Sequence, residues 1–142
     1  MDADSLPLAQ KFNFNIDLTG SDENYIIFNP GVFNLMGPNP FVKEDRYADI
    51  DFGYLDNYSI NGVYKIPDGY KAEALPKNIS IILPDKSITF KRMIIQQDGS
   101  ISVRYTLTHR KTIYFTENYQ DLRGFYKQLY ELLNDQIVLK KI

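Results

Sequence analysis

The sequence predicts a mainly β fold, namely an antiparallel, immunoglobulin-like β-sandwich with one C-terminal α-helix. Short segments in which apolar and polar residues alternate are separated by turn-forming residues at intervals of roughly 8–12 residues. From residue 118 the apolar residues instead recur at three- and four-residue spacing, as in an amphipathic helix. The chain also has 11 Tyr and 9 Phe but no Trp, and such aromatic residues favour half-buried pleated surfaces.

The N-terminal third contains two predicted strands and one irregular stretch. Over 12–18 every even position is apolar and every odd position is polar, which predicts the first strand. A loop over 20–24 leads to a second short strand at 25–28, which the Asn-Pro-Gly sequence of 29–31 ends. Prolines and a glycine within 36–46 argue against regular structure, so we interpret this stretch as a surface excursion inside the domain.

Alternation returns in the middle of the chain, over 58–66. Asn61-Gly62 within it fits either a two-residue hairpin turn or a bulge or closely packed glycine in a continuing strand. Pro67-Asp68-Gly69 is a firmer turn signal. Short strands are expected after it, at 71–75 and 79–83.

The next two strands are predicted to form a hairpin across Asp98-Gly99. In the first strand, 87–96, a shift of the apolar parity predicts a bulge near Lys91-Arg92. The return strand has apolar residues at every odd position of 101–107, and we expect it to run on through Phe115.

The C-terminal part combines the helix with an apolar tail. The helix is predicted over 118–134, with Asn118 as its N-cap and Asp121 in capping-box position. Its apolar stripe is wide enough to require burial against the sheets. The tail, 136–142, is predicted to add a strand to an open sheet edge, and a frayed terminus is the alternative.

Composition limits the function classes. A length of 142 residues suits a single domain over 1–142. The net charge is −2 and the basic residues are scattered, which argues against nucleic-acid binding. No apolar run approaches the roughly 18 residues of a transmembrane helix, and we expect neither such a segment nor a signal peptide in this stretch of chain. The lack of cysteine excludes disulfides, thiolate metal sites and cysteine nucleophiles.

No motif points to catalysis, a metal or a cofactor. His109 is the sole histidine and has no second histidine or cysteine to work with, so we expect a structural or solvent-facing side chain. The aspartates between Glu44 and Asp56 do not have the spacing of a calcium loop and are interpreted as a solvated loop. We therefore predict a domain that is not an enzyme, with no catalytic residue, no metal ligand and no cofactor.

The candidate binding residues lie in one segment: Arg46, Tyr47, Asp51, Phe52 and Tyr54. The tyrosines of 47–64 suit either a sugar-stacking platform or cross-strand packing, and their burial distinguishes the two. Arg46 and Asp51 flank a loop and are expected to anchor it as a partly buried charged pair, so Arg46→Ala should lower the melting temperature.

Short motifs occur in order from about residue 37 to the end. Those of the first half are Asn39-Pro40-Phe41, Arg46, Asp51-Phe52-Gly53, Ile66-Pro67-Asp68-Gly69-Tyr70 and Ala74-Leu75-Pro76. Those of the second half are Asp98-Gly99, Tyr119, Leu122, Phe125-Tyr126 and the closing residues 136–141. Together they resemble a C-terminal domain of unknown function that follows transglutaminase-like domains in exported bacterial proteins. Residues 1–36 match this pattern more weakly, and Ala48 stands where a proline is expected.

The resemblance implies a place and a role. It implies a periplasmic or extracellular parent protein whose catalytic cysteine lies upstream, in a transglutaminase-like domain that is the partner of this one. The implied function is a non-catalytic accessory domain that supports or orients this core. A glycan- or peptide-binding module at the cell surface is the alternative, and we expect the isolated domain to be monomeric.

Overall fold

The computed structural model describes residues 10–11, 13, 15, 18, 20–32, 34 and 36–142. The strand predicted over 12–18 rests on Phe12, Phe14 and Ile16, which lie outside the described residues. Asn13, Asn15 and Leu18, which are described, belong to no strand.

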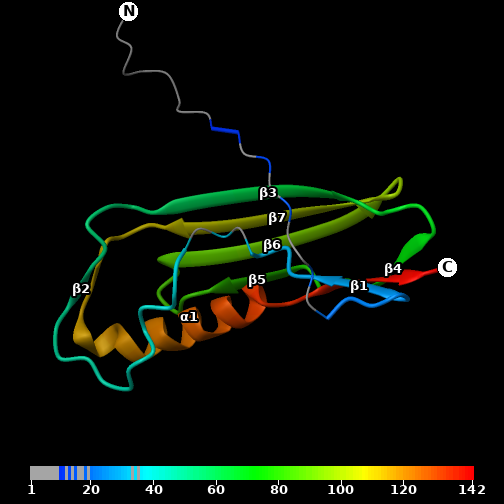
Figure 1. Cartoon of the computed structure of the whole chain (residues 1–142). Helices are drawn as coiled ribbons and strands as arrows, with labels where there is room; N and C mark the ends of the chain where they lie inside the picture. Colours follow the sequence, from blue (N-terminus) through cyan, green and yellow to red (C-terminus); the bar gives the residue numbers. More distant parts are fainter. Residues whose placement is uncertain are drawn as a thin grey trace, which may run out of the picture.

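A four-stranded antiparallel sheet forms one layer of the molecule (Figure 1). Its strands follow the order β3-β7-β6-β5, that is Asn57–Lys65, Ser100–His109, Ile88–Gln97 and Ile79–Ile82. The predicted hairpin between β6 and β7 is confirmed: Asp98 and Gly99 have φ of 48° and 72°, and Gln97 pairs with Ser100. Two positive φ angles suit the right-handed twist of a two-residue hairpin, which explains the Asp-Gly pair.

Strand β3 runs without interruption through Gly62. Gly62 pairs with Val103 of β7, so the hairpin-turn alternative at this position is wrong. A Cβ on Gly62 would lie only 3.0 Å from Cε2 of Tyr64, and the closely packed glycine is therefore the correct alternative.

The bulge predicted near Lys91-Arg92 is also wrong. The register of β6 with β7 is unbroken over all ten residues of each strand. Arg92 occupies an inward position and is buried, whereas Met93 and Ile95 face outward and are about half exposed. The apolar parity shifts because a charged residue lies on the core side of the strand, not because the backbone changes register.

The second layer combines a helix with a three-stranded sheet. Helix α1 (Tyr119–Leu133) lies along one face of the four-stranded sheet, and its C-terminal end leads directly into β9 (Ile137–Lys141) (Figure 1). β9 pairs with β1 (Tyr25–Phe28) on one side and with β4 (Tyr70–Ala74) on the other, antiparallel to both. The C-terminal tail is thus a strand, as predicted, but it is the central strand of its sheet and not an added edge.

The fold is mainly β, with antiparallel sheets and one C-terminal helix, as predicted. An immunoglobulin-like sandwich consists of two facing sheets. Here α1 covers part of the four-stranded sheet where such a fold has strands, so the immunoglobulin-like arrangement is not confirmed. None of the helices among the described residues has the length and apolar character needed to cross a membrane.

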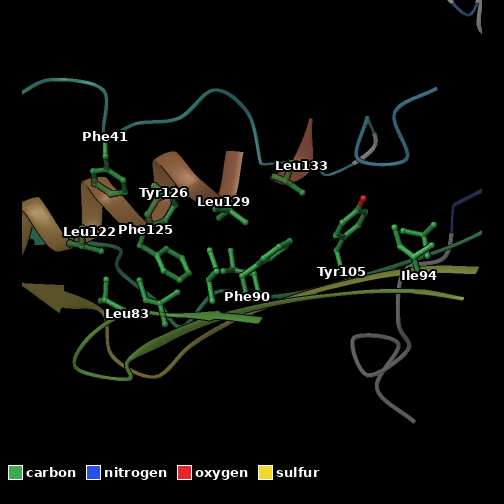
Figure 2. Packing of buried hydrophobic residues seen from close by; sticks show 14 of the residues in the cluster. Phe41, Leu83, Phe90, Ile94, Tyr105, Leu122, Phe125, Tyr126, Leu129 and Leu133 are labelled. Carbon is green, nitrogen blue, oxygen red and sulfur yellow. The ribbon is translucent and has the colours of Figure 1, made fainter. Parts of the chain in front are cut away.

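The core lies between the two layers (Figure 2). The helix stripe is buried as predicted: Tyr119, Leu122, Phe125, Tyr126, Leu129 and Leu133. Leu83 and Phe90 from the sheet and Phe41 from the irregular segment face it. The capping box is not formed, because Asn118 is the N-cap residue but makes no side-chain cap hydrogen bond and instead ends a 3₁₀ turn, η2 (Thr116–Asn118).

A short two-stranded sheet closes the molecule near the start of α1. It pairs β2 (Ile50–Asp51) with β8 (Ile113–Tyr114), so that Ile50 opposes Tyr114 and Asp51 opposes Ile113. β7 therefore ends at His109 and does not run on through Phe115, as the sequence had suggested. This small sheet positions the segment that contains the predicted binding residues.

Candidate functional site

Exposed apolar side chains gather around the β2–β8 sheet. Six of the thirteen large hydrophobic residues that are exposed in the described part of the chain belong to the segments 42–55 and 113–115. These six, called the end surface below, are Val42, Tyr47, Tyr54, Leu55, Ile113 and Phe115. Figure 1 places both segments at the end of the molecule that carries β2 and the start of α1. A concentration of exposed apolar side chains is a common mark of an interaction site.

Strand alternation explains why β8 contributes to the end surface. Tyr114 points inward, is fully buried and donates a hydrogen bond from its hydroxyl to Ser87 Oγ at 2.8 Å. Its neighbours Ile113 and Phe115 must then point outward, because successive strand residues face opposite sides. Both side chains are at least half exposed.

The predicted binding residues do not form one cluster. Tyr47 and Tyr54 belong to the end surface and are 93% and 67% exposed. Phe52 instead turns inward and packs edge-on against Phe41 and Tyr114. The aromatic segment is therefore divided: two of its rings are exposed and one joins the core.

The charged pair predicted to anchor this loop is not formed. Arg46 is exposed, and its Nε donates to the carbonyl oxygen of Ala48 at 3.0 Å. Asp51 accepts a hydrogen bond from the backbone N–H of Gly53 at 2.8 Å. Among the described residues the ion pairs join Arg92 with Asp135 and Lys111 with Asp85, and neither involves Arg46.

The effect expected for Arg46→Ala is therefore small. An exposed side chain with one backbone hydrogen bond contributes little, and we expect the free energy of unfolding to change by less than about 0.5 kcal/mol. Urea unfolding of the variant and of the wild-type chain measures this difference. A clear drop in stability would mean that Arg46 makes a contact that the structure does not contain.

An aromatic pocket lies beside the end surface, between β3, β7 and α1. It has a volume of about 160 Å³. Its walls are Met36, Pro40, Phe52, Asp56, Tyr58, Leu107, His109, Tyr126 and Tyr130. Phe52 and Asp56 flank the exposed Tyr54 and Leu55 in the chain, so one short segment contributes both to the pocket and to the end surface.

His109 lines the pocket, and both of its ring nitrogens are hydrogen-bonded. Nδ1 lies 2.7 Å from the backbone carbonyl oxygen of Asp56, and Nε2 lies 2.9 Å from the hydroxyl of Tyr126. A carbonyl oxygen can only accept, so Nδ1 carries the hydrogen, and in the neutral imidazole Nε2 accepts from Tyr126. Of the two alternatives predicted for His109, a structural or a solvent-facing side chain, this buried and doubly bonded position agrees with the structural one.

The pocket favours neutral tyrosines and has a negative character. Burial, followed by the charge of the Asp56 carboxylate, raises the pKa of Tyr58. Burial also raises the pKa of Tyr126 strongly, with nearby tyrosines and Asp56 adding to the shift. Burial and the neighbouring Tyr58 raise the pKa of Tyr130. All three tyrosine hydroxyls thus stay protonated near neutral pH, and Asp56 supplies the acidic side chain of the pocket.

A second, smaller cavity of about 90 Å³ lies under β3. Its walls are Pro30, Ile60, Asn61, Gly62, Tyr64, Val103 and Tyr105. The Tyr105 hydroxyl is buried without a hydrogen-bond partner among the described residues, and burial raises the pKa of Tyr105 to about 12. No charged residue lines this cavity, so it offers less for ligand recognition than the aromatic pocket does.

The acidic loop does not form a metal site in the described part of the chain, where no three His, Asp or Glu side chains come together to hold an ion. Asp49 and Asp51 accept hydrogen bonds from the backbone N–H groups of Thr116 and Gly53. Asp56 lies on the pocket wall. These aspartates are thus spread over separate local contacts.

Sequence reasoning identified Phe52 and missed the rest of the pocket. Asp56 and Tyr58 were noted only as part of an acidic run and an aromatic run. Tyr126 and Tyr130 fit the three- and four-residue spacing of an amphipathic helix, which by itself indicates packing and not a pocket. Strand parity places His109 on the same face of β7 as Leu107, and it is the signal in the sequence that could have found their shared position in the pocket.

Comparisons with known proteins identify the family. None of the curated proteins matches the chain significantly. Among solved structures, the chain is similar to that of a "putative protease" from Parabacteroides distasonis ATCC 8503, with a TM-score of 0.69 and 14% sequence identity. The likeness covers 84% of this chain and 24% of that one, so the chain spans about a quarter of the length of that protein. At this identity the likeness shows a shared fold alone.

The family match covers residues 23–139 and so begins earlier than the ordered motifs suggested, since it includes β1. It includes strands of all three sheets, the helix and most of β9. The chain belongs to the DUF3858 family, a domain of unknown function for which a structure has been solved.

Proposed function

We propose that this chain is a non-catalytic accessory domain of a larger exported protein, and that it docks on a neighbouring transglutaminase-like domain through the end surface. The observation that carries the proposal is the gathering of Tyr47, Tyr54, Ile113 and Phe115 in exposed positions at one end of the fold. An exposed apolar surface of this kind is stabilised by contact with a partner. The similarity to about a quarter of a longer protein supports a role as one domain among several.

The chemistry of the chain supports a non-catalytic role. The sequence contains no cysteine and one histidine. Both ring nitrogens of that histidine are engaged, by the Asp56 carbonyl and the Tyr126 hydroxyl. General base catalysis needs a ring nitrogen within reach of the group that it deprotonates. The periplasmic or extracellular location and the transglutaminase-like neighbour rest on the motif resemblance.

The proposal is tested by comparing hydrogen–deuterium exchange of this chain alone with exchange of the longer protein that contains it. We expect segments 42–55 and 113–115 to exchange more slowly in the longer protein, because docking excludes solvent from them. Ile113→Asp should abolish this protection and leave the exchange of the β6–β7 hairpin unchanged.

Ile95→Asp is the matched control, because Ile95 is exposed to the same extent as Ile113 but lies on the outer face of β6. It should leave the protection of segments 42–55 and 113–115 intact. Equal exchange of these segments in both contexts would overturn the docking role. Peptide or ester hydrolysis by the purified chain would overturn the non-catalytic role.

A peptide-binding module is the second candidate function, and the aromatic pocket favours it. Pockets for drug-sized ligands occupy about 300–1,000 Å³. The aromatic pocket, at about 160 Å³, suits one amino-acid side chain better than a sugar ring. Tyr47 and Tyr54 could stack on a glycan, but Phe52 between them is turned inward, so the segment offers no continuous platform.

A further inference from the structure

We propose that the aromatic pocket binds a primary ammonium group, presented as the lysine side chain of a polypeptide. The proposal goes beyond the docking role and does not depend on it. It rests on three features of the pocket: its aromatic walls, its charge, and the hydrogen-bonding capacity that its polar groups have left.

Besides His109, four of the pocket residues carry aromatic rings, and these four come from three separate parts of the chain. Phe52 follows β2, Tyr58 lies on β3, and Tyr126 and Tyr130 lie on α1 one helical turn apart. The rings of Phe52 and Tyr126 are nearly parallel, with centroids 6.4 Å apart. Aromatic faces attract cations through their quadrupole, and a set of such rings is a recurrent way of holding an ammonium group.

The charge of the pocket is negative and has no ion-pair partner within the described part of the chain. Asp56 supplies a carboxylate to the pocket wall. No lysine or arginine is in ion-pair distance of it, since the ion pairs among the described residues involve Asp85 and Asp135. Because the carboxylate is partly buried beside aromatic rings, a cation placed there is less screened than on an open surface.

The polar groups around Asp56 have free acceptor oxygens but few free donor hydrogens. The Tyr126 hydroxyl hydrogen is directed to His109 Nε2, and the Tyr130 hydroxyl donates to the Gly37 carbonyl at 3.0 Å. The Tyr58 hydroxyl hydrogen-bonds the Asp56 carboxylate, which still has further lone pairs on its two oxygens. These lone pairs and the oxygens of Tyr126 and Tyr130 remain available as acceptors. A lysine ammonium group has three donors and no acceptor, so its chemistry complements this arrangement.

Size then restricts the ligand. A volume of about 160 Å³ accepts the end of one unbranched side chain and excludes bulkier cations with several rings. The apolar walls, which include Met36, Pro40 and Leu107, suit the methylene groups of a lysine side chain.

The test uses the full chain and Nα-acetyl-lysine methylamide, followed by two-dimensional amide NMR. We expect shift changes at Asp56, Tyr58 and His109, and about tenfold weaker binding for Asp56→Asn, since the charge-assisted hydrogen bond is lost. Asp51→Asn is the matched control, because Asp51 is an exposed carboxylate of the same segment outside the pocket. It should bind the probe as the wild-type chain does.

Two further measurements keep the outcome clear. Asp56→Asn should fold normally, because His109 is held by the backbone carbonyl of Asp56 and not by its side chain. If the melting temperature of this variant falls, Tyr130→Leu at the pocket wall is used in its place. Tyr130→Leu should also weaken binding of the lysine probe. The Nε-acetylated probe, which is neutral, should cause no shifts. The proposal is overturned if the lysine probe causes no shifts at the pocket, if the neutral probe binds equally well, or if these pocket variants bind like the wild-type chain. None of these results bears on the exchange of segments 42–55 and 113–115, so the docking role is tested separately.

Discussion

Deletion of residues 136–142 is expected to unfold the chain or to make it self-associate. These residues contain β9, the central strand of its sheet, which pairs with β1 and with β4. Ile137 and Leu139 are buried in the core and are 0% and 3% exposed. Burying one such side chain contributes roughly 1.5–3 kcal/mol, whereas a whole domain is stable by only about 5–15 kcal/mol. The deletion also leaves β1 and β4 without their common partner, and unpaired strand edges promote association.

Thermal unfolding and light scattering of the purified chain measure both expected effects. Ile142→Ser is the control, because Ile142 is 85% exposed and keeps its backbone hydrogen bond to Gly69 in the variant. It should change neither stability nor association. A deletion variant that melts like the wild-type chain and stays monomeric would show that β9 contributes nothing to the fold.

Replacing Arg92 by methionine is expected to destabilise the chain by about 3 kcal/mol. The buried guanidinium donates to three acceptors: the Lys77 carbonyl at 3.0 Å, the Leu132 carbonyl at 2.7 Å and Asp135 Oδ2 at 2.7 Å. Leu132 lies in the last turn of α1, where carbonyl groups have no partner within the helix and the helix dipole favours a positive charge. Arg92, which lies on β6, therefore connects the C-terminal end of the helix and the segment before β5 through its hydrogen bonds. Methionine preserves the apolar stem but leaves these acceptors without their donor.

Asp135→Asn distinguishes the contribution of the ion pair with Asp135 from that of the two hydrogen bonds to backbone carbonyls. The Asp135 side chain is 46% exposed, so water can replace its partner, and we expect a loss below about 1 kcal/mol. Urea unfolding of both variants gives the comparison. If Arg92→Met proved as stable as Asp135→Asn, the bonds from Arg92 to the two carbonyls would not contribute measurably.

The features that the sequence predicted well are local ones. The Asp98-Gly99 hairpin follows from the positive φ angles that its turn requires, and the helix over 119–133 follows from the spacing of its apolar residues. The tail was predicted to be a strand because Ile137, Val138 and Leu139 are too apolar for a free end. Each of these inferences depends only on residues that lie close together in the sequence, within one turn, one helix or one strand.

The errors arose where a residue acts against its local pattern. Arg92 is charged but lies on the buried side of β6, and this was interpreted as a bulge. The same strand shows outward apolar residues at Met93 and Ile95. Alternation cannot reveal that a guanidinium is buried when its acceptors, the Leu132 carbonyl and Asp135, lie 40 and 43 residues away in the sequence.

Periodicity and turn chemistry act over short distances, so they suffice to predict the class of structure, the positions of most strands and of the helix, and the burial of the helix stripe. The tertiary structure, by contrast, places α1 and the β1-β9-β4 sheet in one layer. It also decided which of the candidate residues meet: Phe52 joins Asp56, His109 and Tyr126 in the pocket, while Tyr47 and Tyr54 remain on the end surface. The physical reason is that packing of the helix brings together residues up to 94 positions apart, such as Tyr130 and Met36, and no local pattern encodes such contacts.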